Sequence, residues 1–141
     1  MSTTEARRKL IEQVWAGAWG RGDVDALDQL LGPSYLRHGG DGHAQNLSAF
    51  KASIVSTRSA FPDLVTTLDD VVVDGDKAAI RWHSSGTHEN ALLGVPATKR
   101  HVEVSGATFA RFEGDRIVEE FVTWDPRALL SALGIIRVGQ D

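Results

Sequence analysis

The stretch RFEGDRIVEEFVTWDPRALLSALG, residues 111–134, decides the fold class of this chain. Its Gly114-Asp115 pair is typical of a tight turn between two β-strands, and residues 116–124 are predicted to form the second of them. Asp125-Pro126 predicts the start of a short helix, because aspartate is a good cap and proline fits the first turn. The apolar face of this helix comprises Leu129, Leu130 and Leu133, and Gly134 ends it.

Three further strands are predicted upstream of this stretch, at residues 64–73, 77–88 and 99–112. Asp74-Gly75-Asp76 is typical of a hairpin turn and joins the first two. Residues 89–98 form a longer loop before the third. Together with residues 116–124, these strands predict an antiparallel meander.

The first half of the chain is predicted to be mainly helical. A helix after Thr3 or Thr4 carries an apolar stripe made of Leu10, Ile11, Val14, Trp15 and Ala18. A short helix after Asp23, a short strand over residues 34–38 and a helix capped by Asn46 follow. Helices before an antiparallel meander predict an α+β fold in one domain, residues 1–141. A curved antiparallel sheet would wrap around the N-terminal helices and leave a cavity between them.

Composition excludes several classes of protein. The formal net charge is −4 without a long Lys/Arg run, so we expect no nucleic-acid partner. The chain has no cysteine, which excludes disulfides, thiolate metal ligands and a cysteine nucleophile. No signal-peptide pattern is visible, and no apolar stretch reaches the ~18 residues that span a bilayer. We therefore expect a cytoplasmic protein with no membrane partner.

Several short motifs resemble the SnoaL-like polyketide cyclases of the NTF2-like superfamily. They are Phe61-Pro62-Asp63-Leu64, Arg81-Trp82, Gly86-Thr87-His88, Gly94-Val95-Pro96-Ala97-Thr98, and residues 111–120 with Trp124-Asp125. The resemblance covers roughly residues 5–135. It implies an NTF2-like cone, or α+β barrel, which agrees with the predicted order of elements. It also implies an enzyme of antibiotic biosynthesis that closes a ring of an aromatic polyketide by intramolecular aldol condensation, without metal or cofactor.

Asp125 is the first candidate for a catalytic residue. In the resembled family an acidic residue at the end of the last strand acts as general acid/base, and Asp125 matches that position. Taken alone, Asp125 is a good helix cap, and capping is compatible with catalysis. Neighbouring Phe121 and Trp124 favour apolar surroundings for its carboxyl group, although strand alternation can turn Trp124 to the opposite face.

Other residues are candidates for the same site. His38 follows a strand and precedes a Gly-rich turn, where it would polarise a carbonyl or merely bond the backbone. Arg81 would stabilise an enolate or form a surface salt bridge. A planar aromatic substrate needs flat apolar walls, so the predicted substrate-binding residues are Trp15, Tyr35, Phe61, Arg81, Trp82 and Phe109. The remaining histidines, His43, His83, His88 and His101, lack the spacing of a metal site.

Two alternative functions stay open, and one interface is predicted. A hydroxylase of the same fold would insert oxygen into a related substrate, with a partner reductase supplying electrons. A non-catalytic ligand-binding module would use the leucine-rich residues 128–136 to dock on a partner. Val118, Val122 and Trp124 are expected on the exposed sheet face, which predicts a sheet-to-sheet homodimer.

Overall fold

A computed structural model describes residues 3–39 and 42–135. Its sheet has six strands in the order β2-β1-β6-β5-β4-β3. The strands are β1 (Leu31–His38), β2 (Ala44–Asn46), β3 (Val65–Asp74), β4 (Lys77–Thr87), β5 (His101–Glu113) and β6 (Arg116–Trp124). The helical segments are α1 (Thr3–Trp15), the π-helical turn η1 (Ala16–Gly20), the 3-10 helix η2 (Val24–Gln29), α2 (Leu47–Ala60) and α3 (Pro126–Ala132).

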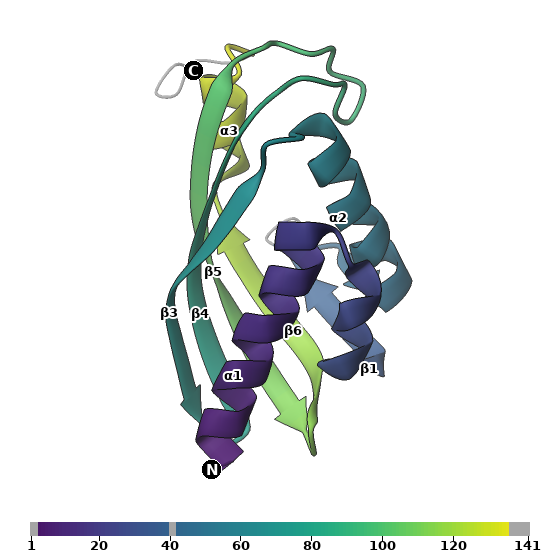
Figure 1. The fold of residues 1–141 in the computed structure, drawn as a ribbon, viewed down its shortest axis with the longest axis vertical. Coiled ribbons are helices and arrows are strands. Elements are labelled where there is room, and N and C mark those ends of the chain that lie inside the picture. The colour runs from purple at the N-terminus through teal and green to yellow at the C-terminus, as the bar shows by residue number, and fades with distance from the viewer. Residues whose placement is uncertain (1–2, 40–41, 136–141) are drawn as a thin grey trace.

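The sheet is curved, and α1 and α2 lie on its concave face (Figure 1). Helix α1 packs against β3, α2 packs against β1, and α3 packs against β5 at one end of the sheet. We call the opposite face, which these helices leave uncovered, the outer face. This arrangement confirms the predicted α+β fold with a curved sheet around N-terminal helices.

The sequence predicted no partner for β1, and the structure pairs it with two strands. Strands β3 to β6 form the expected antiparallel meander. Strand β1, however, runs parallel to β6 and places His38 opposite Phe121. It begins at Leu31 instead of Ser34, with Pro33 inside an irregular stretch of the pairing. Such an irregularity tolerates proline, which cannot donate to a regular ladder.

Two apolar clusters hold the layers together. The larger one fills the concave face and includes Ile11, Val14, Trp15, Tyr35, Phe50, Ile54, Ile80, Phe112 and Ile117. The predicted apolar stripe of α1 is therefore mostly buried. The smaller cluster joins Phe61, Val102 and Leu133 below α3, with Leu129 packed against it. Leu129 and Leu133 thus contact their own chain, whereas Ile135 is 44% exposed and Ile136 lies outside the described residues. Docking of residues 128–136 on a partner stays a prediction.

The predicted exposed stripe on β6 is wrong at Val122. Val122 is only 7% exposed, whereas its neighbour Phe121 is 50% exposed and Trp124, also predicted, is 38% exposed. The pairing of β5 with β6 shifts between Arg111 and Phe112, and Val118 is the extra residue. Such a bulge changes the phase of the side-chain alternation, which the sequence pattern does not show.

Candidate functional site

Asp125 follows the last residue of β6 and caps α3. Its Oδ1 accepts a hydrogen bond from the Arg127 backbone N–H at 2.9 Å, which confirms the predicted cap. Its second carboxylate oxygen has no hydrogen-bond partner among residues 3–39 and 42–135. The side chain is exposed, so the apolar enclosure expected around it is wrong.

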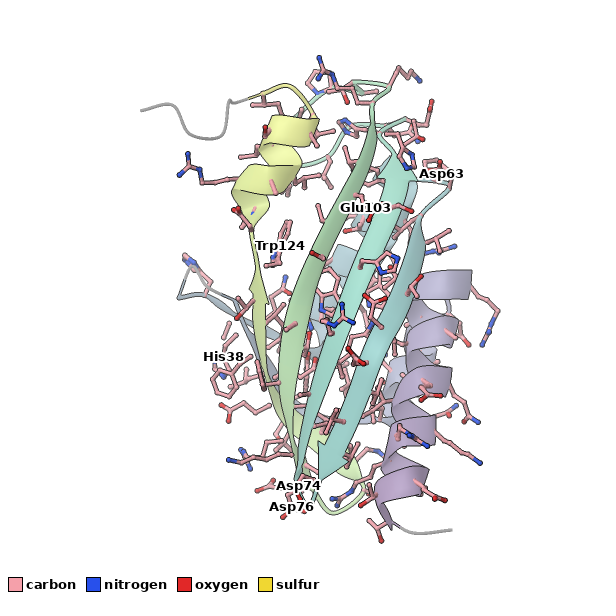
Figure 2. All side chains as sticks on the ribbon, turned by 90° about the vertical axis from the view of Figure 1, so that its left-hand side faces the viewer. His38, Asp63, Asp74, Asp76, Glu103 and Trp124 are labelled. Carbon is pink, nitrogen blue, oxygen red and sulfur yellow. The ribbon has the colours of Figure 1, made fainter. Side chains whose placement is uncertain are left out.

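A groove of about 480 Å³ opens beside Asp125. Its lining comprises Arg81, Ser105, Gly106, Ala107, Thr123, Trp124 and Asp125, from β4, β5, β6 and the residue after β6. Figure 2, which faces the outer side of the sheet, shows Trp124 close to the start of α3. Of the predicted site residues, the structure thus brings Asp125 and Arg81 to one groove.

Gly106 permits the close packing of strands below this groove. A Cβ atom at this position would lie 2.6 Å from the Thr123 carbonyl oxygen and 2.6 Å from the Trp82 ring. The Trp82 indole lies on the concave side, where its Nε1 donates to Thr108 Oγ1 at 3.1 Å. Trp82 is therefore a partly buried packing residue behind the groove, and it is not among the lining residues.

Arg81 forms the surface salt bridge that the sequence left open, and it also lines the groove. Its Nη2 lies 2.7 Å from Asp70 Oδ2, so it forms a salt bridge on the outer face. The hydrogen bond and the charge of Asp70 raise the pKa of the guanidinium above its usual value. Arg81 therefore offers a permanent positive charge to the groove while Asp70 anchors its side chain.

His38 is not brought near Asp125. Its Nε2 lies 2.8 Å from Glu119 Oε2, and its ring stacks on Phe121 with centroids 4.8 Å apart. The hydrogen bond from His38, with further help from Arg111, lowers the pKa of Glu119. In Figure 2, His38 lies well apart from Trp124 and the groove. The structure therefore does not bring His38 and Asp125 together, and a catalytic role for His38 stays a prediction.

The predicted aromatic walls are spread over both faces of the sheet. Trp15, Tyr35 and Phe61 are almost completely buried in the two apolar clusters. Phe109, in contrast, is 55% exposed on the outer face, opposite Phe121. None of these four residues lines the groove beside Asp125, so they do not form a common wall with it.

Sequence reasoning missed a buried carboxylate on the concave face. Glu120 has a fully buried side chain, and its Oε1 accepts a hydrogen bond from Tyr35 Oη. The same oxygen lies 3.2 Å from Arg37 Nη1. Burial raises the pKa of Glu120, although Arg37 and Tyr35 oppose that shift. Burial and the neighbouring Glu120 charge also raise the pKa of the Tyr35 hydroxyl.

Part of this cluster could have been predicted from the sequence of β1. Tyr35 and Arg37 are two residues apart and therefore share one face of a strand. The parallel register places Arg37 opposite Glu120. The sequence contains the first relation, but the second requires the pairing of β1 with β6.

The described residues contain no group of three or more histidines and carboxylates that could hold a metal ion. His83 bonds Asp69 on the outer face, and the ring of buried His88 bonds Thr98.

Within residues 3–39 and 42–135, no helix is long and apolar enough to cross a membrane.

Comparison with known proteins adds a family and a set of similar structures. The model of the SnoaL-like polyketide cyclase family matches residues 9–133. IdmH from Streptomyces antibioticus, described as a candidate polyketide cyclase, is 28% identical with a TM-score of 0.77, covering 91% of this chain and 98% of IdmH. TsrD from Streptomyces laurentii is 28% identical with a TM-score of 0.85, covering 96% of this chain and 100% of TsrD.

A third similar structure supports the fold alone. AclR from Streptomyces galilaeus, described as a candidate hydroxylase, is 24% identical with a TM-score of 0.84, covering 95% of this chain and 99% of AclR. No protein of curated function matches the chain.

Proposed function

Because this chain belongs to the SnoaL-like polyketide cyclase family, we propose that it closes a ring of a polyketide-like aromatic substrate by intramolecular aldol condensation. The NTF2-like cone fold and the similarity to IdmH support an enzyme of this class. We choose Asp125 and Arg81 as the residues that act in this reaction because both line the same groove. The proposed ligand is a small aromatic molecule.

Asp125 acts as the general acid/base in this proposal. Its free oxygen removes a proton from a carbon next to a carbonyl group, which leaves an enolate and a neutral carboxyl. The enolate carbon attacks a second carbonyl of the same molecule, and the new alkoxide takes the proton back from Asp125. The Arg127 N–H holds the other carboxylate oxygen in place and so fixes the orientation of the base.

Arg81 stabilises the enolate. The negative charge develops on an oxygen, and a fixed positive charge at the groove lowers the energy of that state. Asp70 holds the guanidinium at 2.7 Å and so limits the reorganisation that a free arginine would need. The reaction moves protons and carbon–carbon bonds only, so its chemistry requires neither a redox cofactor nor a metal.

The test replaces the carboxylate while it keeps the cap. Asparagine and serine are both good helix caps, so Asp125→Asn and Asp125→Ser should fold like the wild type. Loss of a general acid/base should lower kcat by about 10²–10⁴-fold on a synthetic aromatic β-keto substrate. Asp115→Asn, at the exposed turn between β5 and β6, is the control and should keep full activity.

Product mass separates this reaction from its competitor. Aldol closure followed by loss of water gives a lighter product, whereas a hydroxylase gives a product heavier by one oxygen atom. Wild-type turnover by both Asp125 variants would remove Asp125 from the mechanism. A product that contains added oxygen would remove cyclisation as the function.

A further inference from the structure

His88 ends the Gly86-Thr87-His88 motif and lies between the end of α2 and the loop over residues 89–99. Its ring is completely buried and stacks on Phe61, with ring centroids 5.3 Å apart. A Cβ atom at Gly86 would lie 3.0 Å from the Cβ of Phe61, so glycine allows a closer approach here than a side chain usually does. The motif therefore fixes the ring of His88 against Phe61 and leaves its two nitrogens for other contacts.

The two ring nitrogens of His88 have different surroundings. The Thr98 backbone N–H donates to Nδ1 at 3.2 Å, and Thr98 Oγ1 lies 3.0 Å from the same nitrogen. A backbone N–H can only donate, so Nδ1 carries no proton and the ring holds its proton on Nε2. Nε2 has no hydrogen-bond partner among residues 3–39 and 42–135. The ring is therefore neutral in this arrangement, with its acceptor turned to the loop.

The loop over residues 89–99 is held at its two ends. The Lys99 N–H donates to the His88 carbonyl oxygen at 2.9 Å, and the His88 N–H donates to that of Arg100 at 3.0 Å. At the tip, Leu93 is 95% exposed and has a φ of 50°. A leucine rarely adopts this left-handed backbone conformation, so the tip adds little to the stability of the closed loop. The bonds around His88 therefore matter for keeping the loop in place.

We propose that His88 is a pH-sensitive device that holds the loop over residues 89–99 when its ring is neutral and releases the loop when a proton from the solvent binds Nδ1. A protonated Nδ1 can donate to Thr98 Oγ1, but it can no longer accept from the Thr98 backbone N–H. The ring then carries a buried positive charge, and neither the Nε2–H nor the Thr98 N–H has an acceptor. Opening of the loop exposes these groups to water and so removes the cost of their burial. This device is independent of the Asp125 groove and of ring-closure chemistry.

The charged side chains on the elements around His88 do not offset the cost of a buried charge. They are Arg58 of α2, Asp63 in the following turn, Glu89, Lys99 and Arg100 of the loop, and His101 of β5. Asp63 bonds the Thr87 N–H at 2.7 Å, and Glu89 pairs with Lys99 at 2.8 Å. Helix α3 contributes Leu129 and Leu133 to the same apolar cluster. Neither carboxylate bonds the His88 ring, so neither stabilises its charged form by direct contact.

Hydrogen exchange of the full-length wild type tests this proposal. The amides of Thr98, Lys99 and Glu89 are bonded in the closed loop, Glu89 to the Ala60 carbonyl oxygen. Their protection factors, which exclude the intrinsic effect of pH on exchange, should fall at least about tenfold from about pH 8 to about pH 5. The Ile117 amide, which bonds Leu30 in the sheet, is the reference and should keep its protection.

Two results for the wild type would overturn the proposal without any variant. Loop amides that are equally protected at both pH values would show that the loop does not open. An equal loss of protection at Ile117 would show that acid unfolds the whole protein instead of releasing the loop.

Variants assign the response to His88. In His88→Asn, the amide oxygen replaces Nδ1 as the acceptor for Thr98 but does not titrate, so the loop amides should stay protected at both pH values. His88→Leu offers no acceptor and should leave these amides poorly protected at both. His101→Asn, at the start of β5, is the matched control and should respond like the wild type. A response that persists in His88→Asn or disappears in His101→Asn would overturn the assignment.

Discussion

Glu120 and Asp125 differ in burial, although both acids belong to the same short segment of the chain. Asp125 is exposed and bonds a helix N-terminus, whereas Glu120 is enclosed with Tyr35 and Arg37. An ionised carboxylate inside the protein loses the hydration that it keeps in the unfolded chain. The titration of Glu120 is therefore linked to folding.

This linkage predicts how stability depends on pH. The folded-state pKa of Glu120 is raised, so the native protein holds a proton that the unfolded chain releases. The resulting stabilisation is fully present below the unfolded pKa of about 4.3 and is lost as the pH rises through the folded-state pKa. Wild type should therefore lose stability relative to Glu120→Gln over that range, by at most ~1.4 kcal/mol per pH unit.

Urea unfolding of both proteins between acid and mildly alkaline pH measures this difference. Arg37 and Tyr35 are the titratable groups that face the carboxylate, and both remain in the variant. Parallel stability curves would show that the glutamate does not hold its proton on folding.

The two acids also show what a sequence can predict at the scale of a residue. The cap at Asp125 depends on the next residue, proline, and on the leucines that follow, all of which are local. The burial of Glu120 depends on a bulge at Val118 and on the parallel partner Arg37. Neither is local, so the acid in apolar surroundings was expected at Asp125 but lies at Glu120.

At the scale of elements, short sequence motifs correctly predicted the turns and the helix cap that depend only on neighbouring residues. The hairpin at residues 74–76, the turn at Gly114-Asp115 and the Asn46 cap are all present. Strand β2 and the parallel pairing of β1 were not predicted, because they depend on contacts between distant segments. The predicted substrate-binding aromatic residues lie on both faces of the sheet for the same reason. The pairing of a strand decides which of its side chains face the helices and which face outward, and this pairing is not visible in the local sequence.

Gly106→Ala tests how tightly the strands pack, because β4, β5 and β6 meet at Gly106 without a side chain between them. Alanine would bring its Cβ to 2.6 Å from the Thr123 carbonyl oxygen, a backbone atom that cannot move alone. We expect Gly106→Ala to destabilise the protein by about 1–3 kcal/mol, as overpacked substitutions do. The midpoint of thermal unfolding measures the effect.

Gly20→Ala is the matched control, because a Cβ there meets nothing within 4 Å. It should leave the midpoint nearly unchanged. Equal midpoints for Gly106→Ala and the wild type would mean that the strands separate easily at this point, and the groove above them would then be less rigid than its geometry implies.

At the scale of the whole molecule, the outer face of the sheet carries exposed apolar side chains without a covering layer. Phe109 and Phe121 are directly opposite one another, 55% and 50% exposed, and Leu36 is 42% exposed. These residues replace the stripe that the sequence predicted on β6. Aromatic side chains concentrated on one open sheet face are typical of subunit contacts.

We therefore expect two copies of the chain to associate through their outer faces. Phe109→Glu places a charge at the centre of this patch, and a buried unpaired charge at an interface is strongly unfavourable. The wild type should sediment as a dimer at micromolar concentration and Phe109→Glu as a monomer. Val55→Glu is the control: Val55 is also 55% exposed but lies on α2, away from the sheet face, so its variant should remain dimeric. A monomeric wild type would leave the patch free for another partner and would reject the homodimer.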